Sequence, residues 1–354
     1  MTSTASPAGS PAVFVRVPHA WCHASASAIA EVADATEEFG FDGVSVQDHL
    51  LSDSGVTPCG GAHGHDDRSV LEAMAVLNFL AGRTRRLRLL SGVLVLPYRS
   101  PVLLAKEIAT LDNLSGGRLT LGVGVGAVAG RQADAEQQLS AHARIAQREF
   151  QAMGVRGDRG SLMDEMLEAM IALWEHDSAS FHGRHVNFEG LDLYPKPVQQ
   201  PHPPVWIGGR SEAALRRVAR IGDGWFPSQA SPDLIVAGRA RITEFVGEVG
   251  RAVPVDQGVN LFASIAKDGA AARAVIVAAL GRRFKHPDAL WNATLSGNPD
   301  EVLDQMRAYI AAGVTAFDVK LLPLGIPETL AQLQLLADTI LPALRSERLG
   351  EATA

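Results

Sequence analysis

Two adjacent polar residues, Asp48 and His49, follow a short apolar run and are the residues best placed for chemistry. The run Gly43–Val46 has the length and composition of a buried strand. Barrel enzymes keep reactive side chains directly after such strands. A histidine there can exchange a proton, because its unperturbed pKa is about 6.5, and a neighbouring aspartate can fix its tautomer. The alternative is a loop-capping aspartate followed by a surface histidine.

Glycines mark two further places where a ligand could approach the backbone. The apolar run Arg118–Val123 is followed by Gly124 and Gly126, which have no side chains to keep a ligand away. Gly208–Ser211 contains two glycines, an arginine and a serine directly before a predicted helix. Amide groups at a helix N-terminus attract phosphate. The alternative for this segment is a plain β-to-α turn.

Two other motifs indicate different chemistry. His63 and His65 have the His-x-His spacing of barrel metal sites, but they lie in a Gly-rich loop and no later predicted strand ends in a matching histidine. Gly122-x-Gly124-x-x-Ala127 fits a dinucleotide-binding fingerprint, but no strand with a terminal acidic residue follows at the expected distance. A metal hydrolase and a dinucleotide-binding domain are therefore minor alternatives, and we expect no bound metal.

The elements that must position these residues alternate between strand and helix. Eight runs are predicted as strands: Ala12–Val17, Gly43–Val46, Leu87–Leu96, Arg118–Val123, Pro204–Ile207, Gly224–Phe226, Gln257–Ile265 and Ala316–Leu321. Helices are predicted at Ser25–Phe39, Ser69–Ala81, Ser161–Trp174, Ser211–Arg220, Pro299–Ala312 and Leu330–Leu344, and from Pro101 to the glycines at 116 and 117. This pattern predicts an α/β fold, a (β/α)8 TIM barrel rather than an open doubly wound sheet.

Three segments depart from the alternation. Residues 127–148 are polar and rich in Ala and Gln, and we interpret them as an insertion that could form a substrate lid. Ser178–Pro203 has the pattern of a small hairpin followed by an extended segment. Residues 1–11 lack the basic start and apolar core of a signal peptide, so a disordered lead is predicted there. One domain is expected over residues 12–354.

Composition narrows the possible partners. Of the 354 residues, 47% are hydrophobic, enough for a large core, and the formal net charge of −7 argues against nucleic acid or an anionic membrane surface as the main partner. No apolar run approaches the length of about 18 residues that a membrane-spanning helix needs. Two cysteines, Cys22 and Cys59, make no disulfide framework, which favours a reducing cytoplasm.

Longer motifs indicate a family. The chain resembles the luciferase-like monooxygenase family, in the branch that uses the deazaflavin coenzyme F420. The most specific match is Pro101–Gly126, and further matches are Phe41–His49, Glu149-Phe150, the helix through Trp174, Pro204–Ser211 and Gly222–Phe226. The resemblance covers nearly everything after residue 11. It implies a bacterial-luciferase-like barrel with its site, and its insertions, at the C-terminal face.

The resemblance also implies which residues hold the cofactor. They are Gly92, Val93, Gly124, Gly126, Gly208, Gly209, Arg210, Ser211, Trp225 and Ser228. Family members often have a non-proline cis peptide at the position of Gly92–Val93, whereas the simpler alternative is an ordinary strand glycine. The cofactor's phosphate is expected near Gly208–Ser211. Trp225 and Ser228 would border the ring or the phosphate tail, and the alternative for Trp225 is a core position.

The resulting hypothesis is an F420-dependent oxidoreductase. It would transfer a hydride between the deazaflavin and a small organic substrate, by reduction of C=C or C=N or by oxidation of an alcohol, with His49 handling the proton and Asp48 supporting it. The first alternative is an FMN-dependent two-component monooxygenase of the same fold, although such proteins tend to carry Glu-His-His rather than Asp-His. A second is a non-catalytic flavin-binding relative. The family often forms homodimers, and we extend this expectation to the chain.

One departure from the family pattern concerns the segment after Gly126. Family members normally pass from these glycines through a short loop into the Glu-Phe motif, whereas here roughly twenty residues separate Gly126 from Glu149. Sugar-phosphate dehydrogenases of the family carry a Glu directly after the glycines that assists proton transfer. This chain has Ala127 there, so that activity is not expected.

Overall fold

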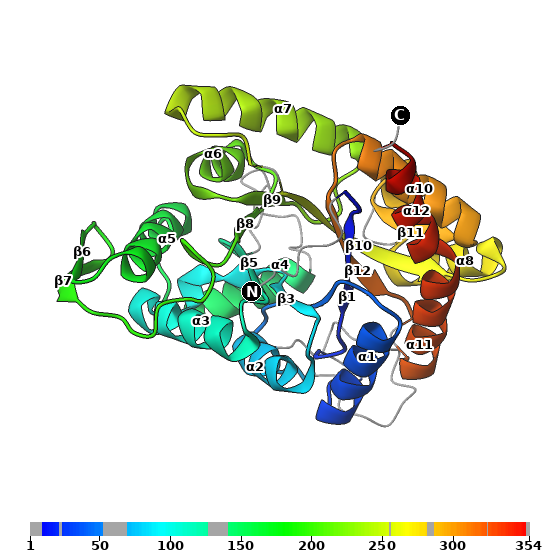
Figure 1. Ribbon diagram of the computed structural model, residues 1–354, viewed down its shortest axis with the longest axis horizontal. Coiled ribbons are helices and arrows are strands. Elements are labelled where there is room, and N and C mark those ends of the chain that lie inside the picture. The colour runs from blue at the N-terminus through cyan, green and yellow to red at the C-terminus, as the bar shows by residue number, and fades with distance from the viewer. Residues whose placement is uncertain are drawn as a thin grey trace.

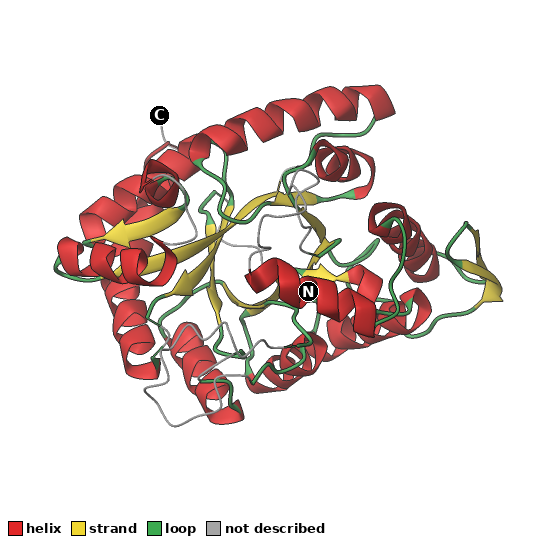
Figure 2. Ribbon diagram, turned by 180° about the vertical axis from the view of Figure 1, so that it is seen from behind, coloured by secondary structure: helices red, strands yellow, loops and turns green. Residues whose placement is uncertain are grey.

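A closed parallel barrel forms the centre of the protein. The computed structural model describes residues 9–20, 23–51, 69–126, 141–254, 256–281, 287–323 and 325–351. Within these ranges the barrel strands follow the order β1–β2–β3–β5–β8–β9–β10–β12, and β12 pairs with β1 to close the ring. Helices surround the strands in both views (Figures 1 and 2). The predicted (β/α)8 TIM barrel is confirmed.

Each predicted strand corresponds to one barrel strand. They are β1 (Ala12–Arg16), β2 (Gly43–Val46), β3 (Arg88–Ser91), β5 (Leu119–Gly124), β8 (Val205–Gly208), β9 (Gly224–Phe226), β10 (Asp256–Ile265) and β12 (Ala316–Leu321). The run Leu87–Leu96 is not one continuous strand: it breaks after Ser91, resumes as β4 (Leu94–Val95) and ends in a 3₁₀ turn at Leu96–Tyr98. An additional strand, β11 (Thr294–Gly297), pairs with β10. The predicted hairpin is confirmed as β6 (Ala179–His182) and β7 (Asn187–Leu191).

The predicted helices are found at the expected positions, but several of their ends differ from the prediction. The helices that the structure describes are α1 (Ala26–Glu38), α2 (Ala73–Arg83), α3 (Pro101–Ser115), α4 (Ala141–Ala152), α5 (Arg159–Glu175), α6 (Glu212–Ile221), α7 (Pro232–Val249), α8 (Gly269–Leu280), α9 (Pro287–Trp291), α10 (Pro299–Ala311), α11 (Ile326–Leu335) and α12 (Leu341–Glu351). The helix predicted from Ser69 begins four residues later, and the terminal helix is divided by a π-helical turn at Leu336–Ile340.

Local signals at the helix ends explain why several boundaries were predictable. Asn298 and Glu301 form a reciprocal capping box at the start of α10, which satisfies two backbone amides. Ser211 caps α6 by accepting a hydrogen bond from the amide of Ala214. Gly116 ends α3 with φ +68°, a conformation that glycine adopts without strain.

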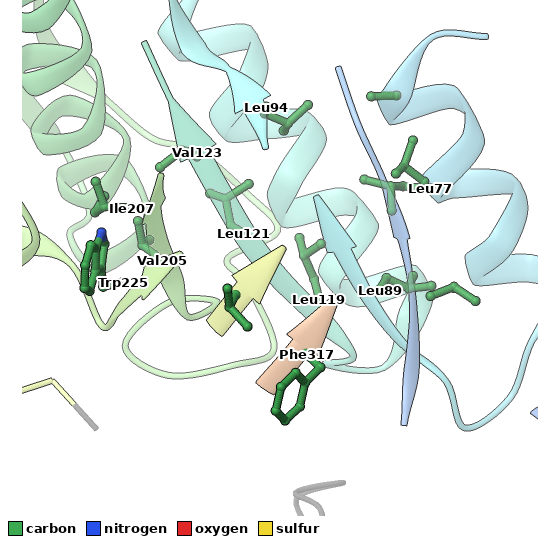
Figure 3. Packing of buried hydrophobic residues seen from close by; sticks show 14 of the residues in the cluster. Leu77, Leu89, Leu94, Leu119, Leu121, Val123, Val205, Ile207, Trp225 and Phe317 are labelled. Carbon is green, nitrogen blue, oxygen red and sulfur yellow. The ribbon is translucent and has the colours of Figure 1, made fainter. Parts of the chain in front are cut away.

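Alternation along the strands separates the two faces of the barrel wall. On β5 and β8 the odd-numbered side chains point outward and pack against the helices, as Figure 3 shows for Leu119, Leu121 and Val123 beside Val205 and Ile207. On β2 the outward positions are the even-numbered Val44 and Val46. These positions are fully buried. The helix-facing layer is therefore a continuous aliphatic core that fixes the barrel shape.

The alternate side chains of each strand fill the barrel interior in two layers. The lower layer is apolar and includes Phe14 and Trp206, whose rings meet edge to face at 6.2 Å, with Phe226 5.6 Å from Trp206. One pleat further along the strands the interior becomes polar. Arg16 pairs in register with Ser45, and Asn260 pairs with Asp318. The strands thus present charged and amide groups toward the C-terminal mouth.

Several predictions concern residues outside the described ranges. Residues 1–8 of the predicted disordered lead (1–11) and residues 127–140 of the proposed lid (127–148) lie outside them, as do the His63–His65 motif and both cysteines. The last part of the lid segment, from Ala141, belongs to α4. Among the described residues no group of His, Cys, Asp and Glu is arranged to hold a metal ion. No helix in the described part of the chain is long and apolar enough to span a membrane.

Candidate active site

The polar interior layer is held together by a buried ion pair between Arg16 and Asp318. Their side chains are 6% and 0% exposed. The Asp318 carboxylate also accepts hydrogen bonds from the Ser45 hydroxyl (2.5 Å) and from the Asn260 amide (2.6 Å). Each donor comes from a different strand, so one carboxylate ties β1, β2, β10 and β12 together at the mouth.

The same guanidinium reaches two residues of the predicted site region. Arg16 Nη2 donates to the carbonyl of Gly92 (3.1 Å), and Nη1 donates to Oε1 of Gln47 (2.9 Å). Gln47 directly precedes Asp48, and Gly92 follows β3. Arg16 therefore links the barrel interior to both segments that the sequence analysis singled out.

Asp48 makes its contacts away from His49. Its carboxylate is 0% exposed and accepts two hydrogen bonds from the Arg99 guanidinium (2.5 and 3.0 Å) and one from the amide of Val95 (2.8 Å). Arg99 also donates to Glu72 (2.6 Å). Burial opposes the charge of Arg99, but these two carboxylates raise its pKa. Asp48 thus anchors the end of β2 to the segment after β3, and its contacts give no support for a direct bond to His49.

His49 instead faces Glu149. Their Nδ1 and Oε1 atoms are 3.6 Å apart, and the two side chains are 16% and 1% exposed. Glu149 also accepts hydrogen bonds from the amides of Leu50 (2.6 Å) and Leu51 (3.0 Å) and from the Tyr98 hydroxyl (2.9 Å). Burial favours the neutral acid, but the nearby imidazole of His49 and the bonds from the two amides hold the pKa of Glu149 below its usual value. A buried carboxylate therefore faces the imidazole.

Aromatic packing fixes the position of Glu149 on α4. The next residue, Phe150, packs against Tyr98 with ring centroids 4.9 Å apart, in a small cluster that includes Val95. Gly126 adjoins this cluster, because a Cβ on it would lie 2.6 Å from the Phe150 ring, and its φ is +78°. The space beside the Gly126 Cα is therefore filled by Phe150 and is not open to a cofactor. Close packing against this ring explains why the position is a glycine.

The Gly92–Val93 peptide bond is cis, as the resemblance implies. Its position is set by the amide of Gly92, which donates to the carbonyl of Val46 at the end of β2 (2.7 Å). The Val93 side chain lies between Gly124 and Gly208, where an added Cβ would approach it to 3.0 and 3.1 Å. Glycine at both positions therefore makes room for Val93 at the barrel mouth.

Gly208–Ser211 lies between β8 and α6. Gly209 has φ +103° and is exposed, as are Arg210 and Ser211. The first turn of a helix contains four amides without intrahelical partners, of which the Ser211 hydroxyl satisfies one. Arg210 donates weakly to the Gln229 carbonyl (3.3 Å). The segment has the exposed backbone and the positive charge that a phosphate group requires.

Trp225 and Ser228 have different surroundings. Trp225 is 3% exposed, its indole N–H donates to the carbonyl of Gly209 (2.8 Å), and a Cβ on Gly238 of α7 would lie 2.0 Å from its ring. Figure 3 shows it on the helix-facing side with Ile207. Trp225 is therefore a core residue that supports Gly209. The exposed Ser228 donates to Asn260 (3.1 Å) and extends the interior polar network to the rim.

A parallel α/β barrel with these groups at its C-terminal mouth defines an enzyme-type scaffold. The chain belongs to the luciferase-like monooxygenase family, which it matches over residues 6–316. This membership assigns the protein to an oxidoreductase family.

Similar proteins include users of different cofactors. The chain is 31% identical over 209 residues to an FMNH2-dependent dimethylsulfone monooxygenase of Pseudomonas putida, a match that covers 58% of this chain and 52% of that protein. An F420-dependent secondary alcohol dehydrogenase has a TM-score of 0.75 at 17% identity, over 95% of this chain and 99% of its own. The oxygenating component of the Pseudomonas putida 3,6-diketocamphane monooxygenase, in complex with FMN, has a TM-score of 0.71 at 15% identity, over 94% and 98%. Both solved structures show the fold alone.

Some residues of the site were not predicted as functional. Glu149 was part of a matched motif but received no role, and Arg16, Arg99 and Asp318 were not named. A signal for two of them was present: Arg16 is the charged residue of an otherwise apolar strand, and Asp318 lies with Lys320 at alternating positions between apolar residues. A charge in such a run must be paired inside the barrel.

Proposed function

We propose that the protein is an F420-dependent oxidoreductase that transfers a hydride between the deazaflavin and a small organic substrate. The observation that carries this proposal is the His49–Glu149 pair at the end of β2, adjacent to the Gly92–Val93 segment after β3. Transfer of a hydride to or from a polar double bond requires a proton donor or acceptor beside the reacting atoms. A histidine oriented by a buried carboxylate meets this requirement.

The described residues fit a flavin-type group. Gly92–Val93, Gly208 and Gly209 would hold its ring and chain through backbone atoms, and Arg210 with the first turn of α6 would hold a phosphate. Support comes from the room that Gly124 and Gly208 leave for Val93 of the Gly92–Val93 segment and from the exposure of Gly209–Ser211. When bound, a deazaflavin supplies or accepts the hydride.

His49 would exchange the proton. Because Nδ1 faces the Glu149 carboxylate, the tautomer with the proton on Nδ1 is favoured and the basic lone pair lies on Nε2. Glu149 stabilises the imidazolium that forms when Nε2 takes up a proton. Asp48 would act on the backbone, since its contacts with Arg99 and Val95 fix the chain immediately before His49.

FMN-dependent oxygenation is the second candidate, favoured by the named use of FMNH2 in the 31% identical relative. The choice is tested by titrating the cofactor-free protein with F420 and, separately, with FMN. Micromolar binding of F420 supports the proposal, whereas micromolar binding of FMN without F420 binding would replace it with the second candidate. Binding of either group without any turnover would indicate a non-catalytic relative.

The proton role is tested by two variants of the pair. His49→Ala should reduce turnover by about 10²–10⁴-fold and leave cofactor binding unchanged, because the residue acts on the substrate. Glu149→Gln keeps the shape of the acceptor but removes the charge that stabilises the imidazolium, so turnover should fall, by less than in His49→Ala, while cofactor binding stays unchanged. Unchanged turnover in His49→Ala would remove His49 from the mechanism.

The cytoplasmic location and the homodimer remain parts of this proposal. The homodimer can be tested by sedimentation.

A further inference from the structure

A pocket opens between the C-terminal ends of β1, β2 and β12. Its polar lining residues are Arg16, His19, His23, Gln47, Lys320 and Thr329, and its other lining residues are apolar. We call it the β1–β12 pocket. Its interior has room for roughly two or three water molecules, which suits one functional group of a ligand rather than a whole substrate.

The lining contains two cationic side chains. Arg16 and Lys320 both contribute to it, and no Asp or Glu is among its described lining residues. The Asp318 carboxylate, which pairs with Arg16, is 0% exposed and lies below the guanidinium in the barrel interior. Lys320 is 8% exposed, and its ammonium lies 5.2 Å from the centre of the Phe262 ring.

Hydrogen-bond donors also converge on this pocket. The Gln47 amide is oriented by Arg16, which donates to its oxygen, so its amino group is the remaining donor. Gln47 Nε2 is buried and has no hydrogen-bond partner in the part of the chain that the structure describes. A buried donor without a partner is costly, and an acceptor on a ligand would satisfy it.

The pocket adjoins the candidate active site. Arg16 contacts the Gly92 carbonyl and lines the pocket with the same guanidinium, and Gln47 is separated from His49 by one residue. A ligand group bound between Arg16, Gln47 and Lys320 would therefore place the rest of a small molecule toward the Gly92–Val93 segment and His49.

We infer that the β1–β12 pocket binds the negatively charged end of the substrate, a carboxylate or sulfonate group of a small organic acid. Such a group contains only acceptors, and it would match the donors of Gln47 and Arg16 and the charge of Lys320. This inference rests on the proposed function, because it assigns a substrate class to that site. It also separates this chain from its relative, whose named substrate, dimethylsulfone, is uncharged.

The test compares anions with uncharged molecules of similar shape. The cofactor-free full-length protein is heated at constant ionic strength with methanesulfonate or dimethylsulfone, and with acetate or acetamide. A bound anion should raise Tm by about 2–4 °C, and its uncharged partner should not. The stronger of the two anions identifies sulfonate or carboxylate as the preferred group. Equal stabilisation by charged and uncharged partners, or none by either anion, would overturn the inference.

Three variants locate the effect. Lys320→Met should weaken anion binding by about 10–100-fold, and Lys320→Arg should restore it. Gln47→Glu keeps the acceptor for Arg16 but replaces the donor with a negative charge, and should abolish binding. Lys267→Met is the matched control, because Lys267 is an exposed lysine after β10 and outside the pocket. An anion response that persists in Lys320→Met and Gln47→Glu would also overturn the inference.

Failure of the inference differs from failure of the proposed function. The same protein samples are titrated with F420 and FMN. Cofactor binding without an anion response refutes the pocket assignment alone. An anion response without binding of either cofactor refutes the proposed function and leaves the pocket assignment standing.

Discussion

Two buried arginine–aspartate pairs stand at the barrel mouth, and their surroundings differ. Asp318 and Asp48 both have fully buried carboxylates. Arg99, the partner of Asp48, is 13% exposed and has a second carboxylate, Glu72, which is itself 43% exposed. Arg16, the partner of Asp318, is 6% exposed and has no second carboxylate among its described contacts. The charge of Arg99 can therefore be balanced by Glu72 and by water if Asp48 is lost. Among its described contacts, Arg16 has only the carboxylate of Asp318 to balance its charge.

The two pairs also differ in the parts of the structure that they connect. The Arg99 pair joins two pieces of backbone, the end of β2 and Val95 after β3, and so holds the chain immediately before His49. The Arg16 pair joins side chains from four strands inside the barrel and contacts Gly92. We conclude that the first is an anchor for one loop, whereas the second organises the whole mouth.

The largest effect is expected from Asp318→Asn. The asparagine keeps an oxygen for Arg16 and Asn260, and the Ser45 hydroxyl can rotate to accept from its amino group, so the change mainly removes a charge. Arg16 is left as a buried cation without a counter-ion, which should cost about 3–5 kcal/mol in the free energy of unfolding. Urea unfolding at pH 7 measures this. A loss below about 1 kcal/mol would show that water or another group compensates Arg16.

A second prediction concerns His19, which lies beside the Arg16 pair. It is 1% exposed, and its ring nitrogens lie 3.0 and 2.9 Å from the carbonyls of Val17 and Gln47. Burial first, and then the charges of Arg16 and Lys320, lower its pKa to about 3, although the two carbonyls favour the charged form. We therefore expect acid to lower the stability of the fold through His19, on the Arg16 side of the barrel mouth.

The sign follows from proton binding. The unfolded chain binds a proton at this histidine near pH 6.5, whereas the folded protein does so only near pH 3. The contribution to stability is complete above pH 6.5 and decreases as the pH falls from 6.5 toward 3. His19 should therefore account for a loss of about 2 kcal/mol between pH 7 and pH 5. His19→Gln should reduce that loss by this amount in parallel urea titrations, and an unchanged loss would contradict the prediction.

The barrel could be predicted from the sequence because its signals are local. Short apolar runs such as Gly43–Val46 alternate with helices marked by Ser, Pro and Gly at their ends, and each signal lies within a few residues. The break in Leu87–Leu96 was not visible, because Gly92 and Val93 fit a continuous strand pattern. The helices α7 and α8 were not predicted, although α7 begins with a clear cap at Ser231.

The candidate site was predictable only in part, because its pairs join distant parts of the chain. Asp48, His49 and Gly92–Val93 were found as motifs. The partner of His49 is 100 positions away on α4, and the partner of Arg16 is on the last barrel strand. No local periodicity encodes such pairs. They are set by strand register and by how α4 packs, which only a three-dimensional arrangement provides.

The smallest effect is expected from Asp48→Asn, the matched change in the other pair. An asparagine oxygen can still accept from Val95 and Arg99, and Arg99 keeps its bond to Glu72. The free energy of unfolding should fall by about 1 kcal/mol, which is the difference between a hydrogen bond to a charged acceptor and one to a neutral acceptor. Because the backbone before His49 stays anchored, turnover should change less than in His49→Ala. A stability loss as large as that of Asp318→Asn would mean that Glu72 does not compensate Arg99, and the contrast between the two pairs would then be wrong.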